Sequence, residues 1–143
     1  MKDNKTPESQ KNDLRRIMRN HGLAKFGDAL TNFLYSRAKT NVVGKPVGER
    51  VFDKALAESL RQIGLRKLMP SNSSSGDLGD GVEALIGYGY LHGLITIDEL
   101  TEIVESTLKR SDFADLSDRK VEREAMIEAF KKAMLEIMER MKE

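Results

Sequence analysis

The sequence contains no cysteine among its 143 residues. This absence excludes disulfide bonds, zinc ribbons and catalysis by a thiol. It also favours a reducing compartment, for which we expect the cytoplasm. Long hydrophobic runs are absent too, since no apolar stretch approaches the roughly 20 residues that a membrane-spanning helix needs. The polar first ten residues lack the apolar core of a secretory signal. The composition therefore predicts a protein with neither disulfides nor a membrane span.

Patterns typical of β-strands are scarce as well. Apolar residues recur at spacings of three and four along most of the chain, as on the buried face of a helix. Only residues 86–91, IGYGYL, alternate as a strand would. We therefore expect an all-α fold class with a bundle of about six helices. The expected helices cover residues 11–20, 23–39, 48–63, 76–92, 96–108 and 116–143.

The organisation of the chain is simple. Residues 1–10 have the composition of a disordered tail, and residues 11–143 are long enough for one domain with its own core. No internal repeat is present. The short stretch at 70–76, PSNSSSG, is typical of a loop between helices. The sequence thus predicts one helical domain behind a tail.

Charge is unevenly distributed, although the net charge is only +1. Residues 1–75 hold 15 Lys or Arg and 7 Asp or Glu, whereas residues 76–143 hold 9 and 16. A basic half can bind phosphates and an acidic half can bind a metal ion, but the halves can equally pair with each other. The candidates for phosphate contacts are Arg15, Arg16, Arg19, Lys25 and Lys45, with Arg37 and Lys39 as further members.

Glu83 is the only charged residue between Gly81 and Leu91, in a segment apolar enough for a buried helix. A carboxylate there is costly unless it is paired, protonated or bound to a cation. Asp80 lies three residues earlier on the same helical face, so a shared divalent cation would offset the repulsion. Oxygen ligands favour Mg²⁺, Mn²⁺ or Ca²⁺ over zinc. The alternative is structural: Asp80 would complement the helix dipole and Glu83 would pair with an arginine.

Three segments resemble the ribonuclease III family, in the family's order. Residues 79–91, GDGVEALIGYGYL, are similar to its second signature, in which Asp-x-x-Glu-Ala-Leu-Ile-Gly leads to an aromatic-Leu pair. Residues 23–34, LAKFGDALTNFL, resemble its first signature, and residues 55–65, ALAESLRQIGL, resemble the helix that connects the two. The resemblance covers roughly residues 12–110 and leaves out the last helix. It is nearest to compact archaeal members without a double-stranded-RNA-binding domain.

The resemblance implies an endonuclease-like helical domain that forms a homodimer and cleaves double-stranded RNA with Mg²⁺, in RNA processing. Mn²⁺ could substitute for Mg²⁺. Asp28 stands where the first signature has its metal-binding aspartate, and Asp80 and Glu83 match the two acids of the second. Asp28 and Glu83 would then be the central catalytic ligands, with Asp80 as a supporting acid. We also expect the Met-rich apolar stripe of the last helix to contribute to the dimer.

Two positions depart from the first signature. Ala24 stands where a Glu is usual, four residues before Asp28, and the position seven before is His21, for which a surface or capping role is expected. This leaves open whether one or two metal ions bind. Glu49 is a candidate for a further acid. The rival hypotheses are a non-catalytic RNA-binding subunit with a degraded metal site, which Ala24 favours, and a helical dimerisation or adaptor protein.

Overall fold

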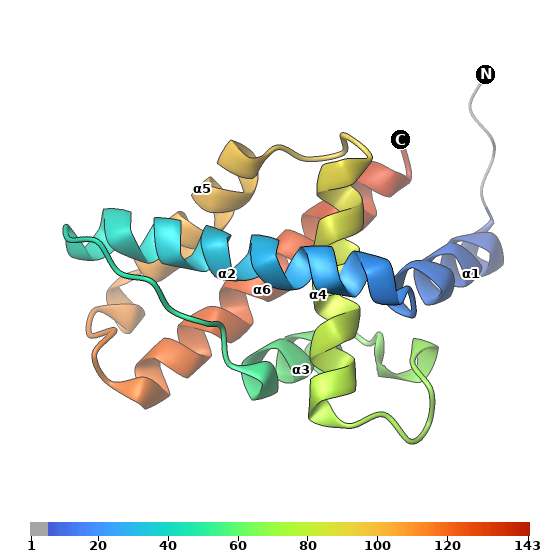
Figure 1. The fold of residues 1–143 in the computed structure, drawn as a ribbon, viewed down its shortest axis with the longest axis horizontal. Coiled ribbons are helices and arrows are strands. Elements are labelled where there is room, and N and C mark those ends of the chain that lie inside the picture. The colour runs from blue at the N-terminus through green and yellow to red at the C-terminus, as the bar shows by residue number, and fades with distance from the viewer. Residues whose placement is uncertain (1–5) are drawn as a thin grey trace.

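The computed structural model describes residues 6–143 and contains six α-helices, with short 3-10 turns at 66–68 and 111–113. The described residues include no β-strand, so the all-α prediction is confirmed. None of these helices is long and apolar enough to cross a membrane. In Figure 1, α2 runs across the front of α4 and α6, and α1 lies beside the N-terminal end of α2. The helices are α1 (Pro7–Met18), α2 (His21–Val43), α3 (Asp53–Gln62), α4 (Ser75–Leu91), α5 (Ile97–Leu108) and α6 (Arg119–Met141).

Polar side chains cap the first turns of the helices that build the fold. Ser74 and Asp77 form a reciprocal capping box at the start of α4, and Thr96 and Glu99 form another at the start of α5. Each pair satisfies two backbone N–H groups that have no partner inside the helix. The loop expected at 70–76 ends at Ser74, the N-cap of α4.

Several expected boundaries were wrong: α2 continues to Val43 instead of ending at 39, and α6 begins at Arg119 instead of 116. The helix α1 begins at Pro7, so the tail expected over residues 1–10 does not include 7–10, and residues 1–5 lie outside the described part. His21 does not end a helix but begins α2, because the Asn20 side chain accepts the N–H of Leu23 as an N-cap. Residues 48–52, expected to be helical, run without helical structure to Asp53.

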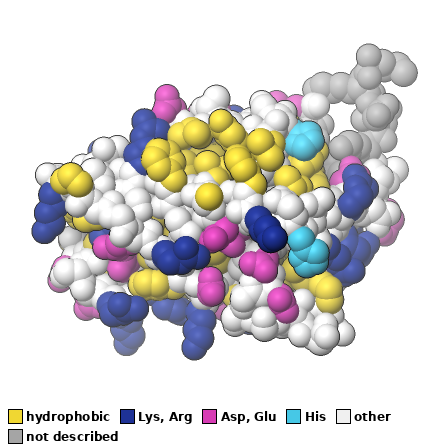
Figure 2. Space-filling view, viewed as in Figure 1, with side chains coloured by type: hydrophobic (Ala, Val, Ile, Leu, Met, Phe, Trp, Pro, Cys, Tyr) yellow, Lys and Arg dark blue, Asp and Glu magenta, His cyan; other side chains and the backbone are white. Residues whose placement is uncertain are grey.

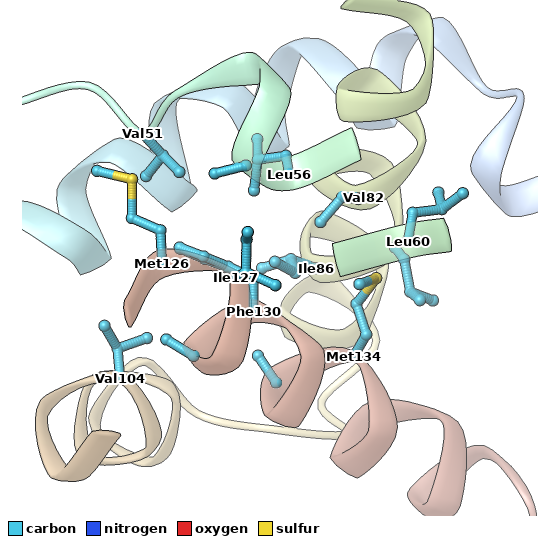
Figure 3. Close-up of a cluster of buried hydrophobic side chains, with 14 of the residues drawn as sticks. Val51, Leu56, Leu60, Val82, Ile86, Val104, Met126, Ile127, Phe130 and Met134 are labelled. Atoms are coloured by element: carbon cyan, nitrogen blue, oxygen red, sulfur yellow. The ribbon is translucent and has the colours of Figure 1, made fainter. Parts of the chain in front are cut away.

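The last helix supplies the centre of the hydrophobic core. Figure 3 shows Met126, Phe130 and Met134 of α6 pointing toward side chains of other helices, and all three are buried within the monomer. The expectation that this stripe forms a dimer surface is therefore wrong. Met126, Phe130, Met134 and Ile137 have no exposed area for a partner, because α3, α4 and α5 already cover them.

The helices α2 and α4 approach each other closely enough for their backbones to touch. A Cβ atom added to Gly27 would lie 1.8 Å from the main-chain oxygen of Glu83, and one added to Gly87 would lie 3.0 Å from the oxygen of Leu23. Only glycine leaves room for this crossing. Gly89 similarly lies against Ile137, at 2.9 Å for its added Cβ. Gly87 and Gly89 thus both serve the close packing of α4 against its neighbours.

Candidate active site

The crossing of α2 and α4 brings Asp28 and Glu83 together, and their side chains share a hydrogen bond. Glu83 is buried, as its apolar surroundings in the sequence predict. Burial, followed by the hydrogen bond and the negative charge of Asp28, raises the pKa of Glu83 to about 8. Thr31 donates its hydroxyl to Glu83 Oε2 at 3.2 Å, which opposes this rise only in part. At neutral pH the pair therefore keeps a proton.

Asp80 lies one turn before Glu83 on α4, and its side chain is more exposed to solvent. Partial desolvation, together with the negative charges of Asp77, Asp53 and Asp28, raises its pKa. His21 opposes the rise, so this exposed histidine at the start of α2 acts on the acidic group through its charge. Aspartates from three helices, α2, α3 and α4, thus act on the Asp80 carboxyl.

Metal-ligand chemistry fits this pair of carboxylates. Within residues 6–143, no three His, Cys, Asp or Glu side chains are gathered into a metal-binding cluster, so the structure joins Asp28 to Glu83 without adding Asp80 as a third member. The donors at hand are nonetheless oxygens on adjoining, fixed helices. Mg²⁺ is commonly held by one or two carboxylates and completes its shell with water and substrate phosphates. Asp28 and Glu83 could hold such an ion between them.

A set of side chains on α2 fixes the backbone that follows this helix. Asn32, Ser36 and Thr40 are spaced four residues apart and therefore share one face. Asn32 accepts a hydrogen bond from the N–H of Val51 at 2.8 Å. The hydroxyl of Ser36 accepts from the N–H of Glu49 and donates to its carbonyl. The hydroxyl of Thr40 does the same with the N–H and the carbonyl of Val47. These bonds replace the helical ones that the sequence predicts for residues 48–52. They hold this segment antiparallel along α2.

Arg50 is the functional candidate that sequence reasoning missed. Because the Asn32 and Ser36 contacts fix residues 49 and 51, the side chain of Arg50 reaches Asp28, with Nη2 lying 3.0 Å from Oδ1. Asn32 Nδ2 donates to the same oxygen at 3.0 Å. Asp28 therefore has a cation and an amide on one oxygen while it also contacts Glu83. No local motif signals this pairing, since 22 positions separate the two residues.

Ala24 lies at a hollow next to the acidic residues of α4. A hollow of about 260 Å³ opens beside Asp80, where Ala24, His21 and Arg19 form part of the wall and Asp77 lies at the edge. Ala24 is itself largely buried. A longer acidic side chain at this position would extend into space next to Asp80.

The basic candidates do not form one continuous surface. Arg15 and Arg16 bond side chains of their own helix, and Arg19 donates to the carbonyl of Leu68 at 3.0 Å. Lys25 is exposed on α2. Lys45 lines a second hollow, of about 850 Å³, at the far end of α2. Figure 2 shows Lys and Arg side chains (dark blue) interspersed with Asp and Glu side chains (magenta) across the middle of the face in view. Phosphate contacts by these five residues stay predictions.

Lys39 is excluded from a phosphate-binding surface, which corrects the sequence interpretation. It is buried, and its ammonium donates to both carboxylate oxygens of Glu49 and, at 2.7 Å, to Glu122. Tyr35 donates its hydroxyl to Glu122 as well. Glu49, the candidate further acid, therefore neutralises Lys39 instead of joining Asp28. Arg37 is likewise engaged, with Asp98 at 2.9 Å.

The comparisons with known proteins identify the family of the chain. The family model described as Ribonuclease III matches residues 21–143, from the start of α2 through the end of α6. The chain therefore belongs to the ribonuclease III family. The match includes the last helix, which the resemblance of the two signatures left out. No curated protein matches the chain well enough to count as a relative. Membership in this family supports an endonuclease activity on RNA.

Proposed function

We propose that the protein is an Mg²⁺-dependent endoribonuclease that cleaves double-stranded RNA in an RNA-processing reaction. The observation that carries this proposal is the contact of Asp28 with the buried Glu83 at the glycine crossing of two helices. A buried pair of acids has no benefit for the fold on its own, because each carboxylate raises the cost of ionising the other. Cation binding is the use that offsets this cost. The cytoplasmic location stays a prediction.

The roles that we propose for the three acids follow from how deeply each one is buried. A bound Mg²⁺ supplies an activated water and offsets charge on a phosphodiester. Asp28 and Glu83 would hold the ion, and Asn32 keeps Asp28 oriented toward Glu83 through its hydrogen bond. Asp80 is exposed one turn away, where it can accept hydrogen bonds from water around the ion and thus act as a supporting acid.

Double-stranded RNA is the substrate class that the surface supports. A-form duplexes are recognised mainly by shape, phosphates and 2′-hydroxyls, which does not demand a base-reading motif. Arg19 and Lys25 lie near the acids along the sequence and on the helices that adjoin them, where they could contact phosphates. A duplex also has two strands, so two acid pairs, one from each of two chains, would be needed to cut both.

An apolar surface on α2 and α4 supports a homodimer. Phe26 and Phe33 are exposed two turns apart on α2, at 38% and 53%, and Tyr90 of α4 stacks on Phe26 with ring centroids 6.0 Å apart. Figure 2 shows hydrophobic side chains gathered on the upper part of this face. Exposed aromatic residues in a group are typical of a protein interface. A second copy of the chain is the partner that we propose for this surface.

Cleavage is tested with one RNA sequence offered both as a duplex and as a single strand. We expect the duplex to be cut in Mg²⁺ and to stay intact in EDTA, with the single strand cut much more slowly on a denaturing gel. Asp28→Asn should abolish cutting, whereas Asp98→Asn, an exposed aspartate on α5, should not. Duplex binding without cleavage under all these conditions would instead support the non-catalytic RNA-binding alternative.

The homodimer is tested by sedimentation at micromolar concentrations. We expect the parent chain to sediment as a dimer and Phe33→Lys to sediment as a monomer, since a charge in an apolar interface is poorly tolerated. Leu135→Lys is the matched control, because Leu135 is 48% exposed but lies on α6, away from Phe33. A parent chain that is monomeric at all concentrations and still cuts both strands would contradict the dimer.

A further inference from the structure

Arg50 lies at the edge of two different environments. One side of its guanidinium contacts Asp28, with 3.0 Å between Nη2 and Oδ1. The other environment is the hollow of about 850 Å³ that Arg50 lines together with Lys45 and Arg119, both exposed. The arginine thus stands between the candidate metal ligands and a surface with several basic groups.

The backbone of Arg50 is fixed while its side chain is free to turn. Asn32 holds the N–H of Val51 and Ser36 holds both main-chain groups of Glu49, so the residues on either side are tied to α2. The Arg50 side chain, in contrast, is 73% exposed, and within residues 6–143 it bonds only Asp28. A fixed Cα with an exposed long side chain allows the guanidinium to move between nearby partners without any change of fold.

Asp28 cannot pair fully with Arg50 and bind a divalent metal ion at the same time. Its Oδ1 accepts the bonds from Arg50 and from Asn32, so a divalent ion that binds this carboxylate meets a guanidinium already close to it. Two cations near one carboxylate repel each other. The acidic groups of the hollow already have partners, since Glu49 and Glu122 are bonded to Lys39 and Asp115 accepts hydrogen bonds from Ser117. A phosphate is the anion of matching geometry for a guanidinium.

We propose that Arg50 exchanges partners during the reaction cycle: it pairs with Asp28 in the free protein, yields this carboxylate to the divalent cation, and then contacts a phosphate of the RNA backbone. Arg50 is thus an internal competitor of the metal ion and a phosphate contact in the complex with RNA. This inference rests on the proposed metal-dependent cleavage of RNA.

The first test measures metal binding without RNA. Mn²⁺ is titrated by calorimetry into the parent chain, into Arg50→Gln and into Arg119→Gln. Arg50→Gln should bind Mn²⁺ at least threefold more tightly, because its competitor is gone. Arg119→Gln is the matched control: this arginine lines the same hollow but lies over the ring of Phe52, at 5.0 Å, and should leave the affinity unchanged.

The second test measures duplex RNA binding in EDTA and in Ca²⁺, with a gel to verify that the duplex stays intact. Arg50→Gln should bind like the parent in EDTA and several-fold more weakly in Ca²⁺, because only then is Arg50 available to a phosphate. The log–log salt slope in Ca²⁺ should fall by about 0.7 to 0.9. Equal losses in EDTA and Ca²⁺, or none in Ca²⁺, would overturn the exchange.

The two proposals fail in different ways. If the parent chain binds Mn²⁺ and Asp28→Asn weakens that binding, but Arg50→Gln binds no more tightly than the parent, the exchange is wrong and the metal site stands. If the parent chain binds no Mn²⁺, or Asp28→Asn binds it equally well, the proposed metal-dependent function itself is wrong.

Discussion

Gly27 of α2 lies so close to Glu83 of α4 that an added Cβ would stand 1.8 Å from the main-chain oxygen of Glu83. The next residue along α2 is Asp28, whose side chain contacts that of Glu83. The same helix crossing therefore sets the packing of the fold and the separation of the two acids. Any change that widens the crossing should separate the acids as well.

Gly27→Ala should affect the site and the fold together. The added methyl group meets backbone, which cannot move aside as a flexible side chain can, so we expect a loss of at least 1–3 kcal/mol in the free energy of unfolding. Cleavage should fall with it. Gly22→Ala is the control on the same helix, since its Cβ would only touch the Asn20 side chain at 3.4 Å. Urea unfolding and a cleavage assay check both; a Gly27→Ala protein of parental stability would contradict the close crossing.

Stability without metal should depend on pH through Glu83. Its folded-state pKa of about 8 lies above the ordinary 4.5, so the folded chain holds more protons between these values. The contribution is complete below about pH 4.5 and is lost as the pH rises through 8. Glu83→Gln removes this titration but keeps the shape. In EDTA we expect it to melt higher than the parent at pH 8 and close to the parent at pH 5. A parent chain that melts higher than Glu83→Gln at pH 8 would refute the raised pKa of Glu83.

Lys39→Met tests the buried ion network. Burial opposes ionisation of Glu122, but hydrogen bonds from Lys39 and Tyr35 hold the pKa of this carboxyl below its usual range. Removal of the ammonium leaves two acids without their cation and should cost about 3–5 kcal/mol in urea unfolding. Lys39→Met with Glu122→Gln should recover part of that loss. Lys25→Met, at an exposed position on the same helix, should change little.

Ala24→Glu should lower the Mg²⁺ concentration that gives half-maximal cleavage. The new carboxylate would extend into the hollow of about 260 Å³ beside Asp80 and add a ligand to the acidic group. Ala24→Gln has the same size without the charge and serves as the control. We expect the benefit only for Glu; an equal shift for both variants would show that size, and not charge, is responsible.

Much of the fold could be predicted from local signals. Thr96 with Glu99 and Asp118 before α6 are caps that act within one turn; α5 begins within one residue of the expected start and α6 within three. The prediction failed where residues distant in the sequence determine the local structure. Residues 48–52 have a helical pattern, but Ser36 and Asn32 of another segment satisfy their backbone groups. Residues 21 and 22 were expected to lie between two helices, whereas the cap by Asn20 makes them part of α2.

The acids of the candidate site could be predicted where a short stretch of sequence, such as an apolar segment around one carboxylate, identifies them. Glu83 stands out because it is the only charged residue from Gly81 to Leu91, and the structure buries it as expected. Lys39 was misread as a surface cation because its partner Glu122 lies 83 positions away. Arg50 was missed for the same reason. Pairings of distant charges depend on helix packing, which a single sequence does not reveal.

The most direct test of the account is the single-turnover rate of duplex RNA cleavage by Glu83→Gln at saturating Mg²⁺. The account predicts a rate at least roughly 100-fold below that of the parent, with the variant still folded and dimeric. Glu102→Gln, an exposed acid on α5, should cut like the parent. A Glu83→Gln protein that cleaves the duplex at the parental rate would contradict the assignment of Asp28 and Glu83 as the metal-binding pair.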